Sequence, residues 1–308
     1  MKKTLTLLMA ILATLTASAI NKQTYTFSAT GADTLKMDVY RPASPQPTPA
    51  LIFAFGGAFT HGQRDDARYV PFFEFLADNG VLVVSTDYRT RLKDLTPAEM
   101  SSVSAFVGKL VDAVTCATTD FYRATGYVLA HAAEWNINPA QIFACGSSAG
   151  AITALQAEYE LCNNVAGVPG FPPAFNYAGV VSFAGAIMAE GEPDWVKTPA
   201  PMLFFHGNAD SNVPFSEAIF SGNGLWGPVA ITKSLADKGV NFWFHRFEGA
   251  DHSIAISPMD NNCGEVLDFI RQTCAGKANL VETVEIVAPQ GTYRTDFTIK
   301  DYIKANMQ

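Results

Sequence analysis

The feature that most constrains the fold is the order of the apolar segments along the chain. Short apolar runs such as Leu51–Phe55 and the first four residues of Val81–Thr86 alternate with stretches that have a helical pattern, such as Ala149–Glu160. Runs that are apolar throughout are typical of parallel strands buried on both faces. The alternation therefore predicts an α/β domain, with a mostly parallel central sheet of about eight strands and helices on both faces.

The individual elements follow from the same patterns. Strands are expected over Tyr25–Ser28, Leu35–Tyr40, Leu51–Phe55, Val81–Thr86, Gln141–Cys145, Ala178–Phe183, Pro201–Phe205 and Asn241–Phe247. Helices are expected from Pro71 to Gly80 and over Ser102–Cys116, Asp120–Trp135, Ala149–Glu160 and Cys263–Cys274, with Asp120 as an N-cap. Cys162–Phe175 carries several Pro and Gly residues and is predicted to be a loop, while Val281–Val287 alternates well enough for a strand.

Composition excludes two broad classes of protein. Apolar residues make up 48% of the 308 residues, which is enough to form a core and argues against a disordered chain. The formal net charge is −8, from 21 basic and 29 acidic residues, and no run of Lys and Arg follows the first three residues. Because nucleic-acid binders neutralise phosphates with such residues, the sequence argues against that function.

The N-terminus has the pattern of a secretory signal peptide. Lys2 and Lys3 precede an apolar segment over residues 5–15, and Ala17-Ser18-Ala19 supplies a small-residue cleavage site. The apolar segment is short for a membrane span, although a retained anchor is the alternative. We expect residues 1–19 to be removed on export, which leaves a periplasmic or extracellular protein without stable membrane insertion. Its net charge would be −10, since two Lys and no acidic residue are lost.

A candidate nucleophile lies between a predicted strand and a predicted helix. Gly146-Ser147-Ser148-Ala149-Gly150 fits the pattern G-x-S-x-G, with Ser148 in the nucleophile position. The glycines allow a sharp turn, and the helix that follows directs backbone N–H groups at developing negative charge. A plain strand-to-helix turn is the alternative interpretation.

A serine nucleophile requires a base, and the base requires an acid that orients it. Asp210 and His252 each follow a predicted strand, so both are expected where the carboxyl ends of the strands meet. The chain order Ser148, Asp210, His252 is the order of α/β-hydrolases. Asp251 is the competing acid, and the competing histidines are His61, His131, His206 and His245.

The segment after the third predicted strand is a candidate oxyanion loop. Phe55-Gly56-Gly57-Ala58-Phe59 follows that strand directly, and adjacent glycines let a backbone approach a substrate closely. On its own the glycine pair is also compatible with an ordinary tight turn.

Together these motifs carry a family resemblance. The chain resembles the α/β-hydrolase esterases related to hormone-sensitive lipase and to bacterial acetyl- and feruloyl-esterases, over roughly Leu35 to Cys274. The motifs are Gly56-Gly57-Ala58-Phe59, Asp87-Tyr88-Arg89, Asn138-Pro139, Gly146-Ser147-Ser148-Ala149-Gly150, the segment from His206 to Pro214, and Asp251-His252. Phe55 stands where the family often has His, and Ala58 where it has a third Gly.

The resemblance implies an α/β-hydrolase catalytic domain over residues 20–274, followed by a C-terminal extension, 275–308, of unknown role. It implies oxyanion donors at Gly57, Ala58 and Ala149. The expected function is that of an exported serine esterase that hydrolyses acetyl- or feruloyl-type esters, on carbohydrates, through an acyl-enzyme. Phe171 and Phe175 are candidate substrate-binding residues, unless these rings only pack their loop onto the core.

Two other functions and several structural questions stay open. The alternatives are a serine peptidase of the prolyl-oligopeptidase type and a catalytically silent carbohydrate-binding protein on a hydrolase scaffold. The peptidases usually have Gly where this chain has Ala151, and they carry a propeller. No metal or cofactor is expected, because no Cys/His cluster has ligand spacing and no loop has a nucleotide-binding pattern. The partner is an ester substrate, the oligomeric state is open, and five cysteines permit disulfides.

Overall fold

The computed structural model describes residues 21–30, 33–165, 171–172, 175–220, 222–277, 279–286 and 296–307. The predicted signal peptide, residues 1–19, lies outside this described part. Among the described residues, no helix has both the length and the apolar character that crossing a membrane requires.

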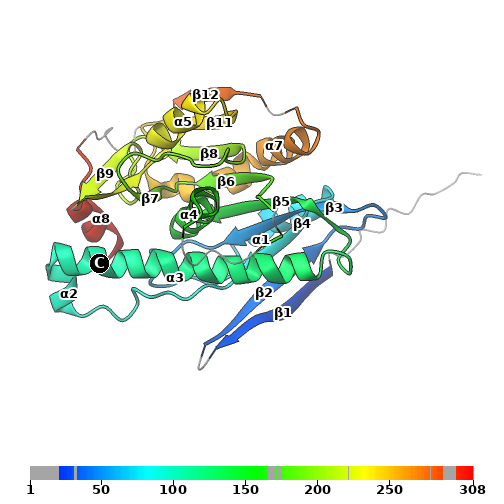
Figure 1. Ribbon diagram of the computed structural model, residues 1–308, viewed down its shortest axis with the longest axis horizontal. Helices are drawn as coiled ribbons and strands as arrows, with labels where there is room; N and C mark the ends of the chain where they lie inside the picture. The colour runs from blue at the N-terminus through cyan, green and yellow to red at the C-terminus, as the bar shows by residue number, and fades with distance from the viewer. Residues whose placement is uncertain are drawn as a thin grey trace, which may run out of the picture.

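A nine-stranded sheet forms the centre of the structure, in the order β1-β2-β4-β3-β5-β6-β8-β11-β12 (Figure 1). Its strands are β1 (Asn21–Thr30), β2 (Asp33–Arg41), β3 (Thr48–Ala54), β4 (Leu82–Thr86), β5 (Ile137–Ser147), β6 (Gly179–Phe183), β8 (Met202–Gly207), β11 (Phe242–Glu248) and β12 (Val281–Ile286). The pairs β1–β2 and β2–β4 are antiparallel, and the others are parallel. The predicted α/β fold with a mostly parallel sheet is confirmed.

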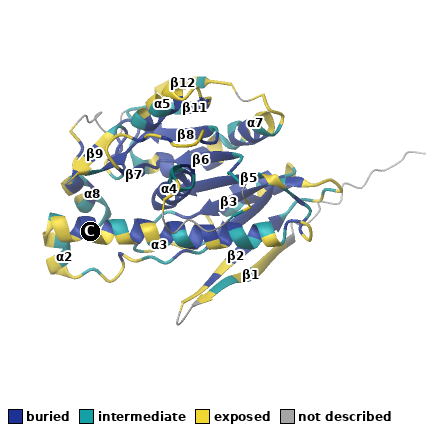
Figure 2. Ribbon diagram, in the orientation of Figure 1, coloured by how far each residue is buried: buried dark blue, intermediate teal, exposed yellow. Residues whose placement is uncertain are grey.

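The continuous apolar runs form the centre of this sheet. All residues of β4, β6 and β8 are buried, as is most of β3. Strands buried on both faces need a helical layer on each side. Figure 2 shows the buried strands between helices whose outer surfaces are exposed.

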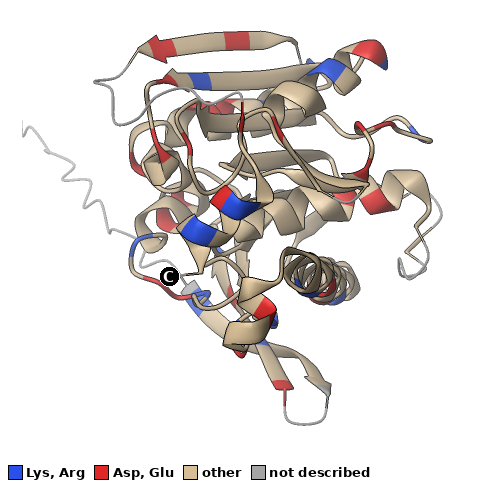
Figure 3. Ribbon diagram, turned by 90° about the vertical axis from the view of Figure 1, so that its left-hand side faces the viewer, with Lys and Arg blue, Asp and Glu red and all other residues tan. Residues whose placement is uncertain are grey.

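Two pairs of helices cover the two faces of the main sheet. Helices α3 (Val103–Ala130) and α4 (Ala149–Asn163) pack against each other on one face, and α1 (Val70–Asp78) and α7 (Cys263–Cys274) on the other. The shorter helices are α2 (Pro97–Ser101), α5 (Pro228–Asp237), the 3₁₀ helix η1 (His252–Ala255), α6 (Pro258–Asn261) and α8 (Ile299–Asn306). Figure 3 shows Lys and Arg positions dispersed among Asp and Glu positions rather than gathered on one element.

Helix α3 corrects the sequence prediction of two helices over Ser102–Cys116 and Asp120–Trp135. A single helix runs from Val103 to Ala130, and Asp120 lies inside it rather than at an N-cap. The buried Asp120 carboxylate accepts hydrogen bonds from the guanidinium groups of Arg89 and Arg123, with the closest N–O distances at 2.8 Å. Because these partners satisfy the carboxylate, it does not compete for the backbone and the helix continues.

A second, three-stranded antiparallel sheet was not expected from the sequence. It consists of β7 (Ile187–Glu190), β10 (Asn223–Trp226) and β9 (Glu217–Phe220), in that order. Each strand has only four residues, which is too short for a clear alternation of apolar and polar residues.

The C-terminal residues join the main fold. The predicted strand over Val281–Val287 is present as β12, which pairs with β11 at the edge of the main sheet. Helix α8 is anchored by Phe297, Ile299 and Tyr302, all buried, and the Tyr302 ring lies 6.2 Å from that of Phe106 in α3. The extension to which the sequence assigned no role therefore joins the fold in two ways: β12 is a mostly exposed edge strand, and α8 packs on the core through buried side chains.

Candidate active site

Ser148 lies at the turn between β5 and α4, in a backbone conformation that few residues other than glycine adopt. Its φ is 51° and its ψ is −118°. The turn brings backbones into contact: a Cβ on Gly150 would lie 2.0 Å from the Ala54 carbonyl oxygen, and one on Gly146 would lie 2.2 Å from the Gly150 oxygen. Both glycines of the pattern are therefore required by close packing.

Three side chains from separate segments form a hydrogen-bonded chain at this turn. The Nε2 atom of His252 lies 2.9 Å from the Ser148 hydroxyl oxygen, and its Nδ1 atom lies 2.7 Å from Oδ2 of Asp210. Ser148 follows β5, Asp210 follows β8 and His252 begins η1 after β11. The structure thus brings the three predicted residues together at the carboxyl edge of the sheet.

The Asp210 carboxylate is buried but has several donors. Its Oδ1 atom accepts hydrogen bonds from the backbone N–H groups of Asn212 (2.7 Å) and Val213 (2.9 Å), and His206 Nε2 lies 3.3 Å from Oδ2. Burial acts to raise the pKa of Asp210, but the His252 and His206 imidazoles outweigh it and hold the pKa well below its usual range. Asp210 is therefore an anion that can orient the His252 ring.

The nearest competing residues have other contacts. The Asp251 carboxylate accepts a hydrogen bond from the Ser253 backbone N–H and caps η1. The Ser147 hydroxyl is buried and donates to the Ala255 carbonyl, 2.8 Å away. Because each side chain has a local structural partner, the geometry favours Ser148 and Asp210 over their neighbours.

Two competing histidines lie in packed aromatic environments. His131 stacks on Tyr127 with ring centroids 4.1 Å apart, at the end of α3. His245 stacks on Phe205 and contacts the Thr283 hydroxyl. Burial lowers the pKa of His245. Neither ring belongs to the Ser148–His252–Asp210 chain of hydrogen bonds.

The oxyanion loop has an unusual backbone that is tied down at its first residues. Gly57 has a φ of 134°, and a Cβ there would lie 2.1 Å from the His61 carbonyl oxygen. The Tyr69 hydroxyl accepts a hydrogen bond from the Gly56 N–H, and the Tyr88 hydroxyl donates one to the Phe55 carbonyl. These contacts fix the loop beside the elbow.

The two departures from the family motif are accommodated in this loop. The Phe55 ring stacks on Tyr88 with centroids 4.3 Å apart, and this contact holds the first residue of the loop in place. Ala58 adopts a positive φ of 52° and, with Gly57, lines the same cavity as Ser148. Ala149 is the first residue of α4, where the N–H has no partner within the helix. Gly57 and Ala58 therefore lie at the cavity over Ser148, and Ala149 lies within the elbow itself.

A cavity of about 370 Å³ opens over Ser148. Its lining residues are Gly56, Gly57, Ala58, His61, Arg68, Tyr69, Ser147, Ser148, Asn212, His252, Ala255, Ile256, Ala305 and Asn306. The sequence predicted Ser148 and His252 but assigned no role at the site to Arg68, Asn212 and Asn306. Asn212 belongs to a motif that it had singled out, whereas Ala305 and Asn306 lie in the tail, where no local pattern pointed to the site.

For Phe171 and Phe175 the structure favours the alternative interpretation, in which the rings pack their loop onto the core. Neither residue lines the cavity over Ser148. Their rings lie 4.8 Å apart, and Phe171 packs against Tyr122 of α3 while Phe175 packs against Tyr177. The segment precedes β6, so it lies at the amino end of that strand, whereas the cavity lies at the carboxyl ends.

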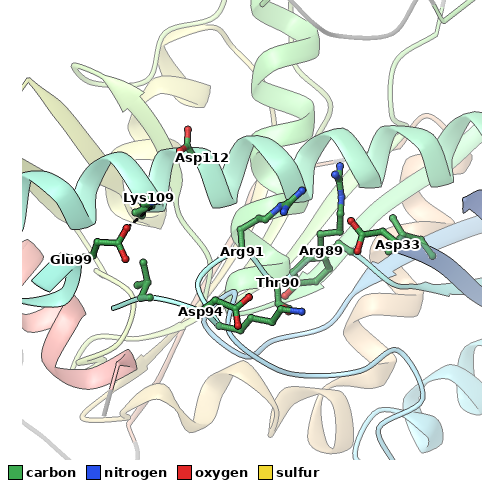
Figure 4. A pocket seen from close by; sticks show the side chains of 12 residues that line it. Asp33, Arg89, Thr90, Arg91, Asp94, Glu99, Lys109 and Asp112 are labelled. Carbon is green, nitrogen blue, oxygen red and sulfur yellow. Dashed lines mark ion pairs between the residues drawn. The ribbon is translucent and has the colours of Figure 1, made fainter. Parts of the chain in front are cut away.

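A second cavity, of about 590 Å³, is larger than the cavity over Ser148 and is lined by different residues (Figure 4). It lies between α3 and the loop after β4, and it shares no lining residue with the cavity over Ser148. Lys109 in its wall pairs with Glu99 at 3.2 Å, and Arg89 is held by Asp120. It contains no serine and no histidine, so it offers neither the nucleophile nor the base of acyl transfer.

Potential metal ligands and cysteines in the described part of the chain form neither a metal site nor a disulfide. Among these residues, no group of three or more His, Cys, Asp or Glu side chains is arranged to hold a metal ion. The five cysteines are all free thiols. Burial raises the pKa of Cys145, as expected for a buried thiol beside the elbow.

Comparison with known proteins gives one family and a set of solved structures. Residues 37–187, just under half of the chain, match BD-FAE, a hormone-sensitive-lipase-like esterase family. This span contains the oxyanion loop and the elbow, and it ends before Asp210 and His252. A comparison with curated proteins found no match.

The similar solved structures are forms of esterase 2 from the planctomycete Thermogutta terrifontis. The propionate-bound form is 22% identical with a TM-score of 0.58, and the butyrate-bound form is 20% identical with a TM-score of 0.60. A form phosphoramylated by tabun is 20% identical with a TM-score of 0.58. These matches cover 83% of this chain and 95% to 96% of the esterase chains.

At this level of identity the solved structures establish the fold, and the family match adds the esterase assignment for the region that contains the elbow. The resemblance to esterases that the sequence predicts is therefore confirmed. The chain is therefore an esterase of the α/β-hydrolase fold, and its residues 37–187 are similar to the BD-FAE family.

Proposed function

We propose that this protein is an exported serine esterase that removes short acyl groups from carbohydrates. The observation that carries the catalytic part is the hydrogen-bonded chain from Asp210 through His252 to Ser148, at the base of an open cavity. In this chain His252 can take the proton of the Ser148 hydroxyl, and Asp210 can hold the His252 ring, as acyl transfer requires.

The reaction follows from the positions of these groups. The Ser148 oxygen attacks the acyl carbonyl while His252 Nε2 takes the hydroxyl proton, and Asp210 stabilises the resulting imidazolium. The N–H groups of Gly57, Ala58 and Ala149 stabilise the oxyanion. When the intermediate collapses, the bond to the alcohol breaks and His252 gives its proton to the leaving oxygen. Water then attacks the acyl-enzyme with His252 as the base, which releases the acid and restores Ser148.

The size and exposure of the cavity support short acyl groups. At about 370 Å³ it is at the small end of ligand pockets. Its lining contains no residue from the three-stranded sheet β7-β10-β9, so that sheet does not act as a lid. The similar esterase from Thermogutta terrifontis binds propionate and butyrate. We therefore expect a preference for acetate to butyrate.

Two observations support a carbohydrate substrate outside the cytoplasm. The sequence pattern of residues 1–19 predicts export, which would place the enzyme among extracellular polymers. The cavity wall is also polar, with His61, Arg68, Asn212 and Asn306 near the nucleophile. An acetylated or feruloylated plant polysaccharide is the natural substrate class that we propose.

A panel of substrates tests this proposal. On the mature chain, p-nitrophenyl esters should give the highest kcat/KM between two and four acyl carbons. Release of acetate or ferulate from xylan tests the polysaccharide. Peak activity at twelve carbons or more would make the protein a lipase, and faster cleavage of aminoacyl amides than of esters would favour a peptidase.

A further inference from the structure

The tail helix α8 ends at the active site rather than on a remote surface. Ala305 and Asn306, in its last turn, line the same cavity as Ser148 and His252. The helix is well defined at its other end, where Thr298 and Asp301 form a capping box. Its buried anchors Ile299 and Tyr302 hold it on the core, so the placement of its last turn is fixed by packing.

The end of α8 is joined to the acid loop by hydrogen bonds between two asparagines. The Asn306 side-chain amide donates to the Asn212 carbonyl at 3.0 Å, and the Asn212 amide donates to Asn306 Oδ1 at 3.3 Å. The Asn212 amide also lies 3.5 Å from the Ala305 carbonyl. Asn212 in turn donates its backbone N–H to Asp210.

The hydrogen-bonding capacity left over is that of an acceptor. The Asn306 Nδ2 atom donates to the carbonyls of Asn212 and Tyr302, which uses both of its hydrogens. Its Oδ1 atom receives one bond, from Asn212, and a carbonyl oxygen accepts two. This part of the cavity can therefore accept a hydrogen bond from a ligand hydroxyl, and an ester whose alcohol has no hydroxyl cannot supply one.

The positions of Asn212 and Asn306 in the cavity wall indicate which part of the ester they face. His252 must deliver its proton to the leaving oxygen, so the alcohol lies on the His252 side of the cavity. Asn212 belongs to the loop of Asp210, the residue that holds the His252 ring, and Asn306 is bonded to Asn212. Gly57 and Ala58 of the oxyanion loop line the same cavity from another segment, between β3 and α1.

We propose that Asn306 of α8 is a specificity-determining residue, whose Oδ1 atom accepts a hydrogen bond from a hydroxyl on the leaving alcohol. This inference rests on the proposed esterase function and deepens it, because it assigns recognition of a hydroxylated alcohol to a segment outside the BD-FAE match. It predicts selectivity for polyol and sugar esters over esters of simple alcohols with the same acyl group.

The test compares two acetate esters, glyceryl monoacetate and ethyl acetate, by pH-stat with the full mature chain. The ratio of their kcat/KM values should fall about fivefold in Asn306→Ala, mainly through KM for the glyceryl ester, as expected for the loss of one neutral hydrogen bond. Asn306→Asp keeps an acceptor oxygen and should retain most of the ratio. Lys304→Ala, an exposed position on the same helix, should leave it unchanged.

The outcomes separate this inference from the proposed function. Active enzyme is counted by fluorophosphonate titration, so partial unfolding of a variant changes the amount of enzyme and not the ratio. A purely structural role would lower both kcat/KM values equally. An unchanged ratio in Asn306→Ala, or an equal fall in Asn306→Asp, would overturn the inference while esterase activity stands. Absence of turnover on both esters in the unaltered protein would overturn the function itself.

Discussion

The two halves of the active site are built in different ways. The nucleophile half, with Ser148 and the oxyanion loop, comes from segments whose backbones pass within contact of one another, so that glycine is required at several positions. The acid half, with Asp210 and His252, is held by side-chain and backbone hydrogen bonds, including bonds from the distant helix α8. We expect the first half to be sensitive to added volume and the second to lost hydrogen bonds.

The largest effect is expected at the nucleophile itself. Ser148→Ala should reduce ester turnover by about a millionfold, because the covalent route is lost. Ser147→Ala is the matched control, since its hydroxyl donates only to the Ala255 carbonyl and not to His252. Turnover of several p-nitrophenyl esters measures both, and normal turnover in Ser148→Ala would contradict the assignment.

The acid half should respond next most strongly. Asp210→Asn should lower kcat about ten-thousandfold, because the amide holds the imidazole in the wrong tautomer. Asp251→Asn should have little effect on kcat, since the Asp251 carboxylate caps η1. If Asp251→Asn is the costlier change, the orienting acid has been misassigned.

Added volume tests the packing of the nucleophile half. Gly150→Ala would place a methyl group 2.0 Å from the Ala54 carbonyl oxygen, and we expect destabilisation of about 3 kcal/mol or more. Gly108→Ala is the control, because no atom lies within 4 Å of its Cβ position inside α3. That variant should gain about 0.5–1 kcal/mol from helix propensity. Urea unfolding measures both free energies, and equal effects would contradict the packing argument.

A smaller, pH-dependent effect is expected where α4 meets the segment before β8. Glu158 of α4 is fully buried, accepts the Ala200 backbone N–H at 2.7 Å and also contacts Cys162 and Asn176. Burial raises the pKa of Glu158. The stability that this group contributes is therefore fully present below the ordinary Glu pKa, about 4.3, and is lost as the pH rises through the folded-state value.

Glu158→Gln should remove this loss, because the amide resembles the protonated carboxyl. We expect a higher Tm than the unaltered protein at pH 8 and a smaller or reversed difference at pH 4, with about 2–4 °C for each 1 kcal/mol. Thermal unfolding across this pH range measures the difference. A difference that grows toward low pH would show that the sign is wrong.

The sequence was sufficient where local pattern and tertiary packing agree. The apolar runs that form β3 and β4 are buried on both faces, and Gly146 and Gly150 mark a turn that excludes larger residues. The sequence was insufficient where a partner far away in the chain determines the local structure. The sequence predicts a helix cap at Asp120, but the guanidinium groups of Arg89 and Arg123 satisfy its carboxylate and α3 continues.

Distant contacts also decide which residues line the site. Phe171 and Phe175 were expected at the cavity on composition, although their segment enters β6 and so lies at the edge of the sheet away from Ser148. Asn306 was missed because the docking of α8 depends on contacts with residues about ninety positions earlier. A contact between residues so far apart in the chain cannot be predicted from a local sequence pattern.

The geometry of the site makes Ser148 the nucleophile, activated by His252 and Asp210. We would treat the protein with a fluorophosphonate and locate the adduct by peptide mass spectrometry. We expect one adduct, on Ser148, which persists in Ser147→Ala, is absent in Ser148→Ala and forms much more slowly in Asp210→Asn. An adduct on another residue, or no adduct in a protein that still hydrolyses esters, would contradict this assignment.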